Sequence, residues 1–295
     1  MSAETASLQP LSTGQPVSRR RPILGWHLHD GIVVGKRNLI QTVRVPELLF
    51  FSLVQPVIFV LMFAYVFGGA IPVPGATGES SAEAYRAYLI PGIFAQTVAF
   101  AAASSTVGIA EDMHKGIIDR FRSLPMKASA VLFGRTFADA ARMILVLTVL
   151  TITGLIVGWR INNGFFSALL AYALLLLFAY VVAWIGSWVG LYMPNPETAN
   201  TAGLIWLFPL TFVSNAFVPL AGMPEALQAV AAWNPLSAMT LACRELFGNP
   251  TGLATGERTY WSLEHPELYT ILSCTLLLLI FVPLAVRKYR RTTAR

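Results

Sequence analysis

The stretch FFSALLAYALLLLFAYVVAWIGSWVGLYM, residues 165–193, decides the fold class because it contains no charged side chain. A helix that crosses the hydrocarbon core of a bilayer needs about 20 apolar residues, so this run is long enough to span a membrane. The rest of the chain has the same character. Of its 295 residues, 55% are hydrophobic and 12% are charged, and the mean hydropathy is +0.61. This composition excludes an ordinary soluble domain.

Five further apolar runs of similar length accompany this one. The six runs lie at residues 47–69, 87–110, 140–159, 165–193, 199–220 and 267–286. Barrel strands would be shorter and would alternate in hydrophobicity, and backbone groups in lipid must pair internally. We therefore predict an all-α membrane protein with six transmembrane helices. These form one domain, residues 25–290, between a disordered tail at 1–24 and a short tail at 291–295.

The distribution of basic residues predicts the orientation. Lys and Arg gather in the N-terminal segment, in the loop after the second run with the start of the third, and in the C-terminal tail. Only Arg86, Arg160, Arg244 and Arg258 fall on the other side. Because cytoplasmic loops carry the excess of Lys and Arg, both termini are expected in the cytoplasm. The net charge of +6 then reflects topology and contact with anionic lipid heads, and a nucleic-acid partner is the poorer explanation.

Two segments outside the spans have patterns of their own. Residues 25–45 place apolar and basic side chains on different sides of a helix, which indicates a helix in the membrane interface, the alternative being a solvated helix. Residues 220–266 are predicted to form an outward re-entrant segment of short helices. Asn234 is a candidate cap, with Pro235 at the first position of a helix that ends before Gly248. The preceding stretch, 226–233, is apolar enough to dip into the membrane if protein covers it.

Chemical groups are scarce within the spans. Asp139 and Arg142 lie at the edge of the third run and could reach the interface or each other, but no acid lies in mid-span. All four histidines fall outside the spans. We therefore predict no catalytic, cofactor or metal site in this chain. If the protein moves a compound, the energy is expected to come from another chain.

The segment EDMHKGIIDRFRSLPM, residues 111–126, collects charge between two apolar runs. Ile117, Ile118, Phe121 and Leu124 would form an apolar stripe on a helix, and Pro125 would end it. Gly116 would allow either a close approach of another backbone or a local break. The pattern indicates a polar cytoplasmic helix at 111–127 that docks on a partner, or one that lies on lipid headgroups.

This segment resembles the signature loop of type-2 ATP-binding-cassette export permeases. The residues that carry the resemblance are Glu111, Gly116, Asp119, Arg120, Arg122, Ser123 and Pro125. The resemblance extends over residues 25–290 and includes the entry helix, six spans, the inner turn at Asn195-Pro196 and the apolar stretch after the fifth span. The daunorubicin-resistance and multidrug group of these permeases is the most similar. Such proteins occupy the plasma membrane, and the Arg-, Ala-, Gly- and Pro-rich composition suggests a bacterial source.

The resemblance implies a mechanism. Two permeases, either two copies or a copy with a sibling, pair in the membrane, and each binds a separate ATPase subunit that holds ATP and Mg. The helices at 111–127 and 25–45 would bracket that ATPase. Coupling is therefore assigned to Glu111, Gly116, Asp119, Arg120, Arg122 and Pro125. By the same resemblance, the path for a hydrophobic or amphipathic compound is assigned to Gln55, Phe59, Gln96, Phe100, Phe212 and Asn215. A self-contained secondary carrier or channel is the alternative function.

Overall fold

The computed structural model describes residues 46–67, 71–74, 81–117, 128–253 and 260–292. The predicted tail 1–24 and the predicted interface helix 25–45 lie outside these residues. Within them the secondary structure is helical, without strands. The elements are α2 (Pro46–Val66), α3 (Ser81–His114), α5 (Ala128–Val157), α6 (Gly164–Gly190), α7 (Pro196–Phe212), η1 (Leu220–Gly222), α8 (Glu225–Ala232), α9 (Pro235–Phe247), α10 (Trp261–Glu264) and α11 (Pro266–Thr292).

Four of the helices are long and apolar enough to cross a membrane: Ser81–His114, Leu132–Val157, Gly164–Gly190 and Pro266–Arg291. The first and fifth predicted spans coincide with α2 and α7. However, α7 has 17 residues, and the apolar helix found in α2 is Leu53–Val66. The all-α membrane class is thus confirmed for the described residues, whereas six spans stay a prediction.

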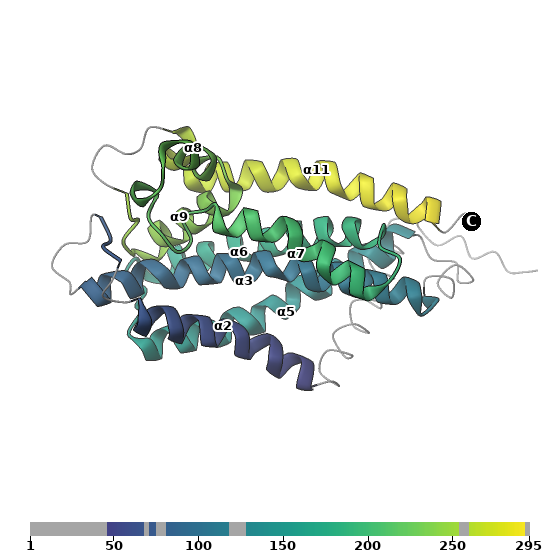
Figure 1. Ribbon diagram of the computed structural model, residues 1–295, viewed down its shortest axis with the longest axis horizontal. Helices are drawn as coiled ribbons and strands as arrows, with labels where there is room; N and C mark the ends of the chain where they lie inside the picture. The colour runs from purple at the N-terminus through teal and green to yellow at the C-terminus, as the bar shows by residue number, and fades with distance from the viewer. Residues whose placement is uncertain (1–45, 68–70, 75–80, 118–127, 254–259, 293–295) are drawn as a thin grey trace, which may run out of the picture.

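The six long helices lie along one axis and alternate in direction (Figure 1). The end of the bundle that holds α8 and α9 is called here the α9 end. The opposite end, where α3 ends and α5 begins, is called the loop end. Helix α3 occupies the centre and packs against α2, α5, α6, α7 and α9. Its side chains are buried along most of its length, so α3 is the core helix of the bundle.

Small residues bring α3 and α6 into backbone contact. A Cβ atom added at Gly186 would lie 2.2 Å from the carbonyl oxygen of Ala102, and one at Gly190 would lie 2.5 Å from that of Thr106. Small residues at a helix interface permit such a close approach of two backbones.

Helix α7 ends earlier than the fifth apolar run predicts. The run extends to residue 220, but the helix ends at Phe212 and the chain then unwinds. The carbonyl groups left free at this end accept hydrogen bonds from side chains. Asn234 Nδ2 donates to the oxygens of Leu210, at 2.7 Å, and Val213, at 2.6 Å. The apolar sequence could not reveal this break, because the donor comes from a later element.

The helix boundaries of α9 are confirmed. Asn234 Oδ1 accepts from the Leu236 N–H at 2.9 Å, Pro235 opens the helix, and Gly248 ends it in the left-handed region with φ 70°. The preceding stretch differs, because α9 is buried within the bundle whereas α8 exposes Leu227 and Val230. Its entry into the membrane, which was expected only if protein covers it, stays a prediction.

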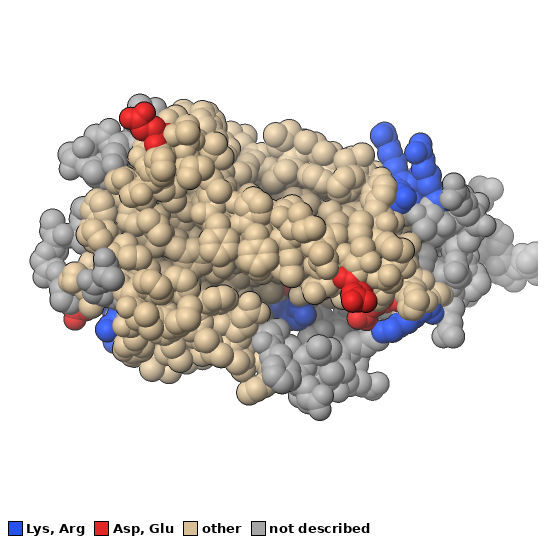
Figure 2. Space-filling view, in the orientation of Figure 1, with Lys and Arg blue, Asp and Glu red and all other residues tan. Residues whose placement is uncertain are grey.

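Charged side chains are unevenly distributed between the two ends. Lys and Arg side chains gather mainly at the loop end (Figure 2), where Lys115 and the last turns of α11 contribute them. At the α9 end, the described basic residues are Arg86, Arg160 and the buried Arg244. This asymmetry agrees with the predicted orientation, although the cytoplasmic location of the termini stays a prediction.

Candidate functional site

Six phenylalanine rings form a continuous strip that joins α2, the segment after α7, α7 itself and α3. Neighbouring ring centroids are separated by 6.1, 5.0, 6.3, 5.9 and 5.9 Å along the order Phe59, Phe63, Phe217, Phe212, Phe208 and Phe100. These distances are typical of interacting aromatic pairs. We call this set the phenylalanine strip. It is partly open, since Phe212 is 64% exposed and Phe208 is 48% exposed.

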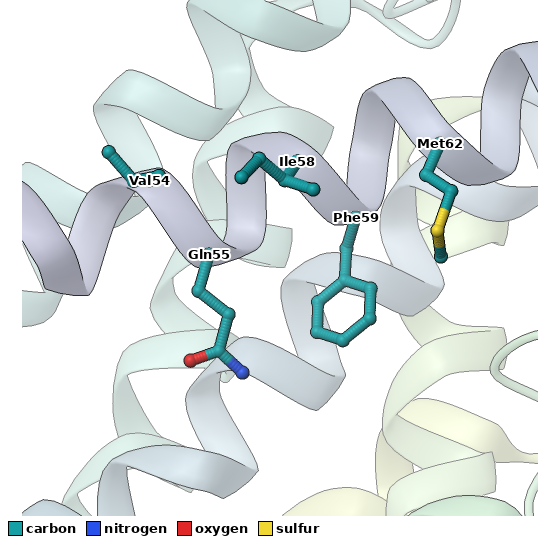
Figure 3. Close-up of a pocket in the computed structure, with 5 residues that line it drawn as sticks. All are labelled: Val54, Gln55, Ile58, Phe59 and Met62. Atoms are coloured by element: carbon teal, nitrogen blue, oxygen red, sulfur yellow. The ribbon is translucent and has the colours of Figure 1, made fainter.

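A shallow pocket of about 390 Å³ lies beside this strip on α2 (Figure 3). Its lining residues are Val54, Gln55, Ile58, Phe59 and Met62. Their spacing places them on one side of a helix, and Figure 3 shows Gln55 and Phe59 projecting in the same direction. Gln55 is the one polar side chain in the lining. The pocket therefore has a single wall, made by α2.

The structure brings together some of the predicted path residues and separates others. Phe59, Phe100 and Phe212 belong to the phenylalanine strip, and Gln55 lies next to it in the pocket. Gln96 is buried within α3. Asn215 is also buried, at the bend after α7, where its N–H donates to Ser237 Oγ at 3.1 Å and its carbonyl accepts from Tyr88 Oη at 2.7 Å. These contacts indicate that Asn215 holds the bend.

The predicted coupling helix begins differently from the expectation. Glu111 belongs to the last turn of α3, where its side chain pairs with Lys115 at 3.0 Å. Gly116 follows with φ 64°, a conformation that ends helices and favours glycine. The structure thus has a helix break at Gly116, one of the two roles considered for this residue, and a coupling helix at 111–127 stays a prediction. Asp119, Arg120, Arg122 and Pro125 lie outside the described residues.

Asp139 was expected to reach the membrane interface or Arg142. Instead its Oδ2 accepts a hydrogen bond of 2.7 Å from Ser105 Oγ on α3. One turn away on α5, Arg135 forms an ion pair with Asp112. Polar groups near the coupling segment thus connect α3 with α5.

Sequence reasoning did not single out Arg244, which is fully buried in α9. Its Nε donates to the Tyr88 carbonyl at 2.8 Å, and one Nη donates to the carbonyls of Asn215, at 2.9 Å, and Ala216, at 3.1 Å. The guanidinium also lies 3.5 Å from the centroid of the Tyr88 ring, a cation–π geometry. The available signal was a lone arginine in the apolar stretch 236–247.

The environment of Arg244 is unusual for a buried charge. Burial lowers the pKa of its guanidinium from the usual value, but arginine remains charged at neutral pH because its pKa begins so high. Its hydrogen-bond acceptors among the described residues are carbonyl oxygens. Arg244 therefore connects α9 to α3 and to the end of α7 through neutral groups.

Comparison with known proteins establishes the class. A family model described as ABC-2 type transporter matches residues 31–247, which end with the last residue of α9. The chain belongs to this family, and it is accordingly a membrane subunit of an ABC transporter.

Individual relatives agree with this assignment. The chain is 33% identical to the daunorubicin resistance ABC transporter permease protein DrrB1 of Streptomyces coeruleorubidus, over 96% of this chain and 92% of that protein. It is 28% identical to the doxorubicin resistance ABC transporter permease protein DrrB of Mycobacterium tuberculosis (strain ATCC 25618 / H37Rv), over 48% of this chain and 50% of that protein. The predicted resemblance to the daunorubicin-resistance group is confirmed.

Proposed function

We propose that this chain forms half of the translocation path of an ATP-driven exporter for hydrophobic or amphipathic compounds. The phenylalanine strip carries the proposal. It offers several partly exposed ring faces and edges within reach of one another, and aromatic rings stack on flat aromatic compounds. Gln55 adds one hydrogen-bonding group beside it, as expected for a mainly apolar binding surface with few polar contacts. Planar amphipathic compounds such as daunorubicin fit this chemistry.

A second permease would complete the path. The pocket on α2 has one wall, and α2 and α7 expose apolar side chains such as Ile58 and Ile205 next to the strip. A second copy or a sibling that packs near these helices would supply the opposite wall. The strip would then face the junction between the two permeases.

The energy would come from a separate ATPase that binds the loop between α3 and α5, with ATP and Mg held by that subunit. The concentration of Lys and Arg at the loop end supports a cytoplasmic position for this loop. Glu111, at the end of α3, and the signature residues that follow it would make the contact.

Copurification tests the partner. The tagged chain is extracted in mild detergent and the proteins bound to it are identified, for the wild type and for the double variant Glu111→Ala with Arg120→Ala. We expect a stoichiometric ATPase with the wild type and its loss from the double variant. Replacing an acid and a base at the α9 end, Glu225→Ala with Arg160→Ala, is the control and should retain the ATPase. An ATPase that is absent from all three samples would contradict the proposal.

Export of daunorubicin tests the path. Cells that express the chain with its ATPase are loaded with the compound, and its efflux is followed by fluorescence. Phe212→Ala should slow efflux by about 2- to 10-fold, the equivalent of one aromatic contact. Phe165→Ala removes an exposed ring of α6 outside the strip and should have no effect. Efflux that stops when the proton gradient is dissipated at constant ATP would instead support a secondary carrier.

A further inference from the structure

Two polar contacts join α3 to α5 near the loop that connects them. Ser105 Oγ donates to Asp139 Oδ2 at 2.7 Å, and Arg135 pairs with Asp112. The side chains of Arg135 and Asp112 are only 16% and 19% exposed. An ion pair that is largely shielded from water is screened much less by salt than a surface pair, so this contact holds the two helices together more firmly than surface charges would.

The positions of these residues match an antiparallel helix pair. Residues 105, 108 and 112 recur at the spacing of one helix face on α3, and residues 135 and 139 do so on α5. At Gly108 a Cβ would lie 1.8 Å from Nη2 of Arg135, so the guanidinium occupies the space beside this glycine. The guanidinium therefore lies against bare backbone at Gly108 on its way to Asp112. We call Ser105, Gly108, Asp112, Arg135 and Asp139 the α3–α5 contact.

A small apolar cluster, separate from the main core, includes residues of α3 and α5 next to this contact in the sequence. Its buried members are Ile109, Leu132, Trp184, Leu191, Ala285 and Tyr289. They come from α3, α5, α6, the turn after α6 and α11, so the cluster extends the contact to the loop end of these helices. A force applied to the paired ends of α3 and α5 would thus reach the other two long helices directly.

Gly116 separates this fixed region from the loop. Its left-handed φ of 64° ends α3, and no atom of the described residues lies within 4 Å of the position a Cβ would occupy there. By contrast, Asp112, four residues earlier, is held by Arg135. The helix pair is therefore fixed by side chains up to Asp112, and α3 ends shortly after it.

We propose that the α3–α5 contact transmits the movement of the ATPase-bound loop to the transmembrane helices, with Asp112 and Arg135 as positioning residues. This inference rests on the proposed coupling to an ATPase. With the ion pair intact, α3 and α5 move as one unit when the loop is displaced. Without it, the displacement is absorbed between the two helices, so ATP is hydrolysed and less compound is moved.

The test measures transport and ATP hydrolysis together. The chain is reconstituted in vesicles with its ATPase, and daunorubicin uptake and phosphate release are recorded for Asp112→Ala, Arg135→Ala and Gly108→Ala. We expect the bound ATPase and the hydrolysis rate to stay near the wild-type values. The ratio of transport to hydrolysis should fall on the order of 10-fold, within the range for residues that couple distant sites. Gly108→Ala keeps both charges and displaces only the guanidinium.

The exchanged pair Asp112→Arg with Arg135→Asp restores opposite charges and should recover at least part of the ratio. Thr148→Ala, an exposed position on α5, is the control and should behave as the wild type. Single variants with a wild-type ratio would overturn this inference alone. A wild-type protein that binds no ATPase, or moves nothing with it, would overturn the proposed function as well.

Discussion

Helices α8 and α9 are neighbours in sequence and both are short, yet their environments are opposite. On α8, Val230 is 60% exposed, and Trp233 directly after the helix is 50% exposed. On α9, every residue from Leu236 to Arg244 is buried. The difference lies in their polar contacts. Arg244 connects α9 to α3 and the end of α7, whereas the Gln228 side chain of α8 donates to the nearby Met223 carbonyl. Helix α8 does accept a long-range hydrogen bond, from Ser262 Oγ to the Ala232 carbonyl at 2.6 Å. The long-range bonds that a buried side chain donates, rather than apolar content, distinguish α9.

Among the substitutions that test this comparison, removing the charge of Arg244 should lower the free energy of unfolding most. Arg244→Met leaves the carbonyls of Tyr88, Asn215 and Ala216 without the guanidinium that they accept from. The Asn215 carbonyl keeps its hydrogen bond from Tyr88 Oη, so at most two buried acceptors are left without a side-chain donor, at a cost of about 1–3 kcal/mol each. The free energy of unfolding should therefore fall by several kcal/mol. Thermal unfolding in detergent, followed by loss of monodisperse protein, measures it.

A lysine at this position separates the effect of the charge from that of the hydrogen bonds. Arg244→Lys keeps the charge but lacks the planar group that reaches three carbonyls at once, so its stability should lie between those of the wild type and Arg244→Met. If Arg244→Met unfolds at the wild-type temperature, the guanidinium is not what holds α9 in place.

A smaller loss is expected from Gly92→Ala. Its Cβ would lie 2.0 Å from the backbone oxygen of Ala216, so the bend after α7 would have to move away from α3 and from Arg244. Overpacking of this kind costs about 1–3 kcal/mol. The same substitution at Gly222, beside α8, meets its nearest atom at an ordinary 3.4 Å and should leave stability unchanged. Equal unfolding temperatures for the two alanine variants would refute the close approach at Gly92.

The third substitution concerns the C-terminal end of α9. Asn249 accepts from Trp159 Nε1 at 2.8 Å and donates to the Arg160 carbonyl at 3.0 Å, so it fastens α9 to the turn between α5 and α6. Asn249→Ala should lower the free energy of unfolding by about 1–2 kcal/mol. Gln228→Ala on α8 removes one local bond and should cost less. A larger loss at Gln228 would reverse the ranking of the two helices.

The smallest effect is expected on the exposed side of α8. Val230→Ser changes a side chain that is already largely outside the protein, and surface substitutions usually alter stability by less than about 0.5 kcal/mol. Unfolding temperatures of this variant and of the wild type should agree within the error of the measurement. A marked loss of stability would show that α8 is covered in the folded protein.

The sequence predicted features that depend on neighbouring residues. The apolar runs located the long helices, and Asn234, Pro235 and Gly248 located the limits of α9, because caps act within one turn. Which short helix is buried was not predictable, because that depends on carbonyls at positions 88, 215 and 216 meeting Arg244. The partner of Asp139 was missed for the same reason: Ser105 lies on another helix.

The candidate path was predictable only in part. The resemblance placed Phe59, Phe100 and Phe212 in one path, and the structure shows that they belong to one strip. Phe63, Phe208 and Phe217 complete it, but a phenylalanine in an apolar run gives no sign of which rings it will meet. Asn215 was assigned to the path by the resemblance, and its backbone contacts at the bend could not be predicted without the fold.

The close contact between α3 and α6 limits how the bundle can change shape. Gly186 and Gly190 bring the two backbones together. A Cβ added at Gly203 of α7 would lie 3.1 Å from the Cα of Ala103 on α3, so α7 is also close. Helices separated by long side chains can slide as those side chains change rotamer, but backbones in direct contact have no such freedom. These contacts favour movement of α3, α6 and α7 as one unit in any rearrangement of the bundle.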